Sequence, residues 1–319
     1  MTPLSDSLTP AAAIDAISVL RELNDVNARL ERLLGELSAY SDADSALRAV
    51  AHDLVAAVER DPDIAFASIL LNQIGGRYAV RHCVESAIVA TLMARAMGKV
   101  GHHLVTIALG ALTMNVGLMR QIEGLQNRDS ALSREERTLV ERHPTESATL
   151  LRCAGVNDDD WIDCVLMHHE KADGSGYPEG RLDAAIPDGA RLISAADRYC
   201  ACVSARNYRR SMLPPAALAK LRAEATTAVD LRLAELFDVQ LGNYPPGTLV
   251  RLTSGEIGVV ARRDQVHLLL DASGTASAPS TGLRRDSALP ANAIVEALHE
   301  DDVRLRFSMK SVWGELANL

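Results

Sequence analysis

The sequence predicts a mainly α-helical protein: a helical bundle with an N-terminal helical segment and a small C-terminal β module. Along most of the chain, apolar residues recur every three or four positions, which is the period of a helix packed on one side. The apolar content comes mainly from Ala, Leu, Val and Ile, and only 3% of residues are aromatic. Alternation typical of strands begins only near Gly242.

These changes of pattern divide the chain into three predicted parts, which are residues 1–58, 59–238 and 239–319. The length of 319 residues fits one large domain with an appendage. The hydrophobic fraction of 48% and the charged fraction of 24% are ordinary globular values, so a disordered or collagen-like chain is excluded.

In the first part, residues 11–58 are expected to be helical, with apolar side chains recurring from Ile14 to Leu37. Residues 41–44, Ser-Asp-Ala-Asp, interrupt this pattern and can cap a second helix that continues to Val58. The apolar stripe fits the seam of a homodimeric coiled coil and equally fits packing on the domain that follows. Both interpretations stay open, and a homodimer through this helix is one predicted interaction.

The second part continues as one helix after another, without strand alternation. The segment that begins with Pro214-Pro215 is expected to form a single helix to Phe237, because proline is tolerated in a first turn. The other expected helices cover residues 64–74, 84–97, 104–118, 134–153, 159–169 and 190–203.

The third part begins with the turn signal Tyr244-Pro245-Pro246-Gly247. Short strands are expected at residues 249–253, 257–261 and 266–270, with a hairpin turn at Ser254-Gly255 and a loop of small residues at 272–280. Together they predict a small β module over about 242–308.

Charge and cysteine content exclude several classes of function. The net charge is −9 and the pI is near 5.5, so a nucleic-acid polymer is not an expected partner. The five cysteines form no CxxC pair, which favours reduced thiols in a cytoplasmic protein. No stretch resembles a signal peptide or a membrane span, so no membrane contact is expected.

The segment richest in chemistry runs from His168 to Pro178 and reads HHEKADGSGYP. Two adjacent histidines end a predicted helix, and a glycine-rich turn follows. Neutral imidazoles bind Fe, Mn, Zn or Ni, and both rings can face one ion near an irregular helix end. A polar helix end followed by a plain turn is the alternative. His82, His143 and Asp197 lie on neighbouring predicted helices and could converge on the same ion.

With its downstream residues, this segment resembles the HD-GYP family of the HD superfamily of metal-dependent phosphohydrolases. The resemblance covers about residues 60–235 and implies a helical bundle that hydrolyses the bacterial second messenger cyclic di-GMP. Residues 243–256 are similar to a β extension often found after that domain. The residues that carry the resemblance beyond Pro178 are Gly180, Ile186-Pro187, Ala190-Arg191, Ala195-Ala196-Asp197 and Arg206-Asn207-Tyr208-Arg209.

The resemblance implies metal ligands, which fall on His143, His168 and His169, with His82 (four residues after Tyr78) and Asp197 as further candidates. The family's signature His-Asp pair is absent. Its His, Asp and following Lys are replaced by Met114, Asn115 and Leu118. The dipeptide His52-Asp53 precedes His82, so it cannot be this pair and is interpreted as an exposed helical dipeptide.

These replacements weaken two-metal hydrolysis. The neutral amide of Asn115 cannot bridge two dications, and the thioether of Met114 is a poor ligand for Fe or Mn. Leu118 removes a cation that would stabilise phosphate charge. Three histidines still suffice for one divalent metal, with Fe or Mn favoured over Zn or Ni, whereas full degeneration would leave none.

The resemblance also implies contacts to the nucleotide. These fall on Arg206, Arg209 and the loop residues Gly174, Gly176, Tyr177 and Pro178. The alternative for the two arginines is solvated charge at a helix end.

The favoured function is therefore a degenerate HD-GYP protein of cyclic di-GMP signalling with impaired or absent phosphodiesterase activity, acting by nucleotide binding or partner docking. A diguanylate cyclase or another signalling protein, docked through the GYP loop, is the expected protein partner. The alternative is an active phosphodiesterase that uses the residual three-histidine site.

Overall fold

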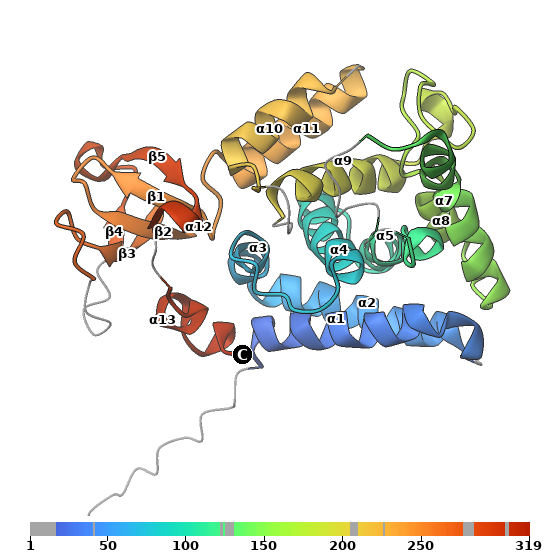
Figure 1. The fold of residues 1–319 in the computed structure, drawn as a ribbon, viewed down its shortest axis with the longest axis horizontal. Helices are drawn as coiled ribbons and strands as arrows, with labels where there is room; N and C mark the ends of the chain where they lie inside the picture. The colour runs from blue at the N-terminus through green and yellow to red at the C-terminus, as the bar shows by residue number, and fades with distance from the viewer. Residues whose placement is uncertain are drawn as a thin grey trace, which may run out of the picture.

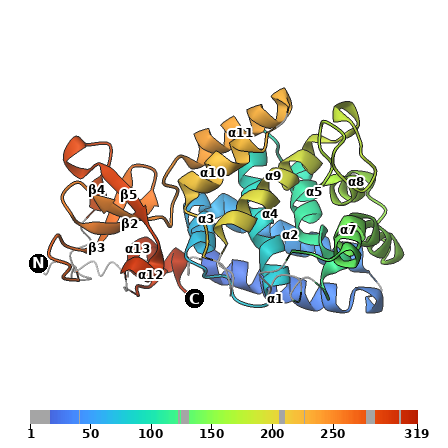
Figure 2. The same cartoon turned by 45° about the horizontal axis from the view of Figure 1, so that its top comes forward.

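The computed structural model confirms the predicted fold class. It describes residues 17–319 except 41, 122–123, 125–130, 205–209, 226, 277–283 and 304–305. A bundle of helices is followed by one antiparallel sheet, and the sheet lies at the end of the molecule opposite to helices α7 and α8 (Figures 1 and 2). Within the described residues, no helix has the length and apolar character needed to cross a membrane.

Helices α1 (Val19–Gly35) and α2 (Ala43–Arg60) pack together along one side of the bundle (Figure 1). The apolar stripe of α1 faces this chain's own core, where Leu20, Leu23 and Leu30 are fully buried. Ile14 lies outside the described residues, and Ile17 is exposed. The second interpretation of the stripe therefore holds, and the predicted homodimer through this helix has no apolar seam in α1 to support it.

Helix α4 (Tyr78–Ala96) forms the centre of the bundle and packs against α5 (His102–Thr113) and α9 (Asp188–Val203). It begins six residues earlier than predicted, and this places His82 inside the helix, directed into the core. The remaining bundle elements are α3 (Pro62–Leu70), α7 (Arg134–Cys153), α8 (Asp159–Met167), α10 (Pro214–Ala223), α11 (Ala228–Leu241), and the 3₁₀ turns η1 (Leu37–Ala39), η2 (Val116–Leu118) and η3 (Asp183–Ala185).

One predicted helix is wrong. The segment that begins at Pro214 forms two helices, α10 and α11, which lie along the same side of α9 (Figure 1). The break occurs because the side chain of Thr227 accepts a hydrogen bond from the backbone N–H of Asp230 and so starts a new helix.

The sheet has the strand order β4-β3-β2-β1-β5, and all its pairs are antiparallel. The last two strands of the chain lie beyond the three that the sequence predicts. Gly247 packs directly on α3, since a Cβ there would lie 2.8 Å from Cα of Ala67. The elements are β1 (Leu249–Leu252), β2 (Ile257–Arg262), β3 (Gln265–Leu270), β4 (Arg284–Asp286), η5 (Pro290–Asn292) and β5 (Ile294–Leu298).

After the sheet, the chain returns to the bundle through α12 (Glu300–Val303), α13 (Met309–Trp313) and η6 (Gly314–Ala317). The hydroxyl of Ser18 donates to the carbonyl of Leu316 at 3.2 Å. Met309 and Ala317 are buried in the core cluster of the bundle. The chain thus contacts the bundle on either side of the sheet. Gly247, just before the sheet, packs on α3, and the segment that follows the sheet returns to the start of α1.

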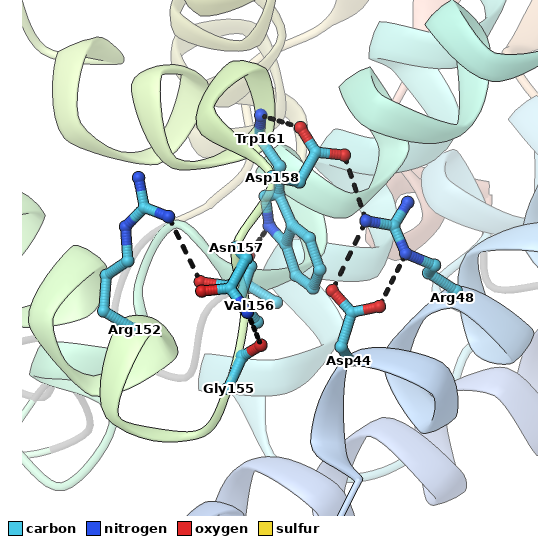
Figure 3. Close-up of polar contacts among 9 residues, drawn as sticks. Asp44, Arg48, Arg152, Gly155, Val156, Asn157, Asp158 and Trp161 are labelled. Carbon is cyan, nitrogen blue, oxygen red and sulfur yellow. Dashed lines mark hydrogen bonds and ion pairs between the residues drawn. The ribbon is translucent and has the colours of Figure 1, made fainter.

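Helix α8 is fixed between α2 and α5 by a polar network (Figure 3). Asp158 caps α8 by accepting from the N–H of Trp161 and also pairs with Arg48 of α2 at 3.0 Å. Arg48 is held in turn by Asp44 at 2.7 Å. The indole N–H of Trp161 donates to Thr113 of α5 at 2.8 Å. These contacts fix the first turn of α8, and the adjacent histidines follow at the other end of this short helix.

Candidate metal centre

His168 is oriented by the carbonyls that are left free where α8 ends. The helix stops at Met167, and the last carbonyls of a helix have no partner within it. Nδ1 of His168 lies 2.7 Å from the carbonyl oxygen of Val165. A carbonyl can only accept, so Nδ1 carries the proton and Nε2 keeps its lone pair.

His143 is oriented in the same way, although it lies in the middle of α7. Pro144 has no N–H, so the carbonyl of Val140 loses the helical partner that residue 144 would otherwise supply. Nδ1 of His143 donates to that oxygen at 2.6 Å. The dipeptide His143-Pro144 therefore fixes its own imidazole, and Nε2 is again left as a lone pair.

The two lone pairs meet. Nε2 of His143 lies 3.2 Å from Nε2 of His168, and neither atom has a proton to share while the rings are neutral. The nitrogen ligands of His143, His168 and His169 all lie within 4.8 Å of one another. Facing acceptors are unfavourable unless a cation lies between them. The three side chains therefore fit a divalent metal with three imidazole ligands and an open position.

Burial keeps these rings neutral. It lowers the pKa of His143 to about 3, with a further contribution from the neighbouring His168. Burial also lowers the pKa of His168, and burial with His168 lowers that of His169 well below its ordinary value. Neutral imidazole is the form that binds a metal.

Beside this cluster, Nε2 of His82 on α4 lies 2.7 Å from Oδ1 of Asp197 on α9. Burial opposes ionisation of Asp197, but the hydrogen bond with His82 outweighs it and lowers the pKa of this carboxyl below its ordinary value. Asp197 therefore supplies a negative charge next to the three neutral rings. The ring of Tyr78 stacks on His82, with centroids 5.5 Å apart.

The segment from Met114 to Leu118, where the resemblance places the His-Asp pair, is packed into the protein. Met114 is fully buried, and Leu118 is buried in the main core cluster. The amide of Asn115 donates to Sγ of Cys83 at 3.9 Å. A Cβ on Gly117 would lie 2.9 Å from the carbonyl oxygen of His143, so only glycine lets this turn pack so closely on α7.

The loop after His169 folds over the cluster. The ring of Tyr177 lies 4.7 Å from that of His169, and the Tyr177-Pro178 peptide is cis. Gly176 has no room for a side chain, because a Cβ would lie 2.5 Å from the carbonyl oxygen of His169, whereas Gly174 has a positive φ of 77°. The two glycines are thus needed for the shape of the loop.

The side chain of Glu170 fixes the shape of this loop through two hydrogen bonds. Its buried carboxylate accepts the backbone N–H groups of Glu179 at 2.7 Å and of Arg181 at 2.9 Å. Such bonds to a charged acceptor are among the stronger hydrogen bonds in proteins. The sequence prediction assigns no role to Glu170, although this residue directly follows the two histidines.

Other predicted residues lie elsewhere. Arg206 and Arg209 fall outside the described residues. His52 is exposed on α2, as expected of a residue outside the site.

Two arginines of α9 that the prediction omits, Arg191 and Arg198, line a cavity beside His169. The sequence signal that could have identified them is their spacing of seven residues, which puts them on one face of a helix.

The chain is similar to known proteins in sequence and in fold. The model of a family described as HD domain matches residues 68–233. Cyclic di-GMP phosphodiesterase PA4108 of Pseudomonas aeruginosa is 31% identical over 218 residues, covering 68% of this chain and 52% of that protein. Cyclic di-GMP phosphodiesterase PdeB of Borreliella burgdorferi is 23% identical over 193 residues, covering 60% and 51%. The chain spans about half the length of these curated relatives.

Among solved structures, Bd1817 of Bdellovibrio bacteriovorus, described as a HDG"Y"P protein, superposes with a TM-score of 0.56. It is 17% identical, and the match covers 74% of each chain. At this identity the likeness is one of fold.

Proposed function

Because this chain belongs to the HD domain family and is an HD-GYP-type protein, we propose that it serves cyclic di-GMP signalling with impaired or absent phosphodiesterase activity. It would act by binding the nucleotide or by docking a partner. The proposal is supported by Met114 and Asn115, which stand where the resemblance places the family's His-Asp pair and are buried, while a three-histidine cluster is present.

The replaced residues remove charge where hydrolysis needs it. Asn115 is neutral at every pH, so it cannot neutralise a second dication. Leu118 lies in the apolar core, so no cation from this position reaches a phosphate. Losing one group that stabilises the transition state costs roughly 10² to 10³ in rate, and losing a second metal removes half of the clamp on the attacking and leaving oxygens.

One divalent transition metal, with Fe or Mn favoured, is proposed to be held by His143, His168 and His169. When bound, such an ion supplies Lewis acidity for the attack of water on a phosphodiester. The backbone carbonyls of Val140 and Val165 keep the first two imidazoles in the required tautomer. Asp197, held by His82, supplies negative charge beside the ligands.

The retained cluster also favours the alternative function, an active phosphodiesterase with a single metal. Tyr177 and the loop that Glu170 holds cover the cluster on one side. Both functions place cyclic di-GMP at the same site. They differ in whether the phosphodiester bond is broken.

The deciding experiment is anaerobic incubation of the purified protein with cyclic di-GMP and Fe(II) or Mn(II), with the products separated by chromatography. His169→Ala runs beside it, and equilibrium dialysis measures binding. Binding without product above the level of the variant supports the proposal. Linear dinucleotide or GMP that the variant fails to form establishes the alternative, whereas neither binding nor turnover overturns the nucleotide part of both.

The docking part is tested with Tyr177→Ala. If a diguanylate cyclase binds wild type and variant equally well, docking through the GYP loop is wrong. The proposed location is the cytoplasm, which the five cysteines support because all of them are free thiols.

A further inference from the structure

A small cavity lies against the metal-ligand cluster, on the side of α9. It has a volume of about 90 Å³, and its lining includes His169, Tyr177 and the α9 residues Arg191, Ser194 and Arg198. Positions separated by three and seven residues share one face of a helix, so α9 presents both guanidinium groups on the same side. A cavity of this size suits one phosphate group better than a whole nucleotide.

Arg191 has a donor that nothing in the described chain uses. Its side chain is only 9% exposed. The Nε group donates to the carbonyl of Ile186 at 3.2 Å, and Nη2 pairs with the carboxylate of Asp183 at 2.8 Å. Nη1 is buried and has no hydrogen-bond partner among the described residues. A buried donor of a charged group without a partner is costly, and a small shift of the Arg191 side chain would bring Nη1 into contact with an acceptor in the cavity.

Arg198 is the second cation of the cavity, and it is only loosely paired. Its Nη1 lies 3.9 Å from Glu224, and the same carboxylate is held at 2.7 Å by Lys220. The other acidic lining residues are Glu170, which binds backbone N–H groups of the loop, and Asp230, at the start of α11. Lys171 adds a further positive charge. Among the described residues, Arg191 pairs with Asp183, whereas the ion pair of Arg198 is the more distant contact with Glu224.

We propose that Arg191 and Arg198 form a phosphate-binding subsite next to His169. Guanidinium is suited to this role, because its charged N–H donors form strong hydrogen bonds with phosphate oxygens. The contacts to Asp183 and Ile186 occupy Nη2 and Nε of Arg191 and hold the side chain in place, which leaves Nη1 for a ligand. That the phosphate belongs to cyclic di-GMP rests on the proposed function, whereas a free phosphate ion would use the same donors.

The test uses the full chain, loaded with Mn(II), and two probes, cyclic di-GMP and inorganic phosphate. Calorimetry measures affinity for the nucleotide, and the shift in thermal midpoint measures binding of phosphate against chloride at equal ionic strength. Arg191→Gln and Arg198→Gln are each expected to weaken nucleotide binding by about tenfold or more. Arg222→Gln is the matched control, because this exposed α10 arginine pairs with Asp238 away from the cavity.

Several outcomes separate this inference from the proposed function. Weaker nucleotide binding in both cavity variants, with the control unchanged, supports the subsite, and circular dichroism verifies folding. If Arg191→Gln does not fold, Arg198→Gln carries the test. Phosphate stabilisation that depends on the arginines, without any nucleotide binding by wild type, supports the subsite while overturning the nucleotide proposal. Unchanged affinities in the variants, or binding of neither probe by wild type, overturn the subsite.

Discussion

His82 of α4 and Asp197 of α9 meet through a hydrogen bond of 2.7 Å in the interior of the bundle. The two side chains are 5% and 14% exposed, so the contact lies largely out of reach of water. It joins the central helix to the helix that also lines the cavity beside the metal-ligand cluster. The carboxylate is thereby fixed before any metal binds.

Replacing His82 by Ala is expected to destabilise the metal-free protein by about 3–5 kcal/mol, because it leaves a buried carboxylate without its partner. Urea unfolding in the presence of a chelator measures the change. His52→Ala is the control, because this α2 histidine is exposed and its loss should change stability by less than about 0.5 kcal/mol. Equal effects of the two substitutions would contradict a structural His82–Asp197 pair.

Asn115→Asp tests whether the lack of a carboxylate at this position is what prevents a second metal from binding. In a chelator the variant should unfold more easily than wild type by about 1–3 kcal/mol, since the new carboxyl group is buried beside the thiol of Cys83. With Mn(II) present the order should reverse, because a dication compensates the charge. Thermal unfolding and metal analysis by mass spectrometry measure both effects. A variant that is insensitive to metal would show that more than the carboxylate is missing.

The buried histidines predict a pH dependence of the metal-free protein. A histidine in the unfolded chain titrates near pH 6.5, whereas the pKa of folded His143 is about 3. Between these values the unfolded state binds more protons, so stability falls as the pH is lowered from about 6.5 to 3. The slope is up to about 1.4 kcal/mol per pH unit for each such histidine.

Unfolding in urea with a chelator at pH 7 and pH 5 measures this slope, and His143→Gln should make it shallower. If the variant and wild type lose the same stability over this interval, the folded imidazole is not protected from protonation in the way that its burial implies.

Glu170 should be essential for the shape of the loop. Glu170→Gln keeps the size of the side chain but leaves only one oxygen for two backbone N–H groups, so we expect a loss of about 1.5–3 kcal/mol. Limited proteolysis between residues 171 and 182 should also become faster. The exposed Glu179→Gln serves as control. Equal cleavage rates in the two variants would mean that other contacts hold the loop.

Local patterns predicted much of the fold. Helix α7 begins where expected because Ser133 and Glu136 form a capping box at its start. The division between α10 and α11 was missed because alanines on both sides of Thr227 continue the helical pattern. The return of the chain to α1 depends on contacts such as that between Ser18 and Leu316, which are about 300 residues apart and leave no local signal.

The same limit applies to the site. The spacing around His168 and the resemblance it carries predicted which histidines gather, and the structure places three of them together. The role of Pro144 follows from its missing N–H, so it could have been derived from the sequence. The unpaired donor of Arg191 could not, because it depends on which neighbours the folded chain supplies to the other two nitrogens of that side chain.

Pro144 has a consequence for engineering this protein. A proline inside a helix ordinarily costs about 3 kcal/mol, so replacing it is an obvious choice for anyone who seeks a more heat-resistant variant. An alanine there would return an N–H to the carbonyl of Val140 and would compete with the imidazole of His143 for that oxygen. The ring would then lose the partner that sets its tautomer. At this position, thermal robustness and competence for metal binding are opposing goals, and the sequence retains the weaker helix.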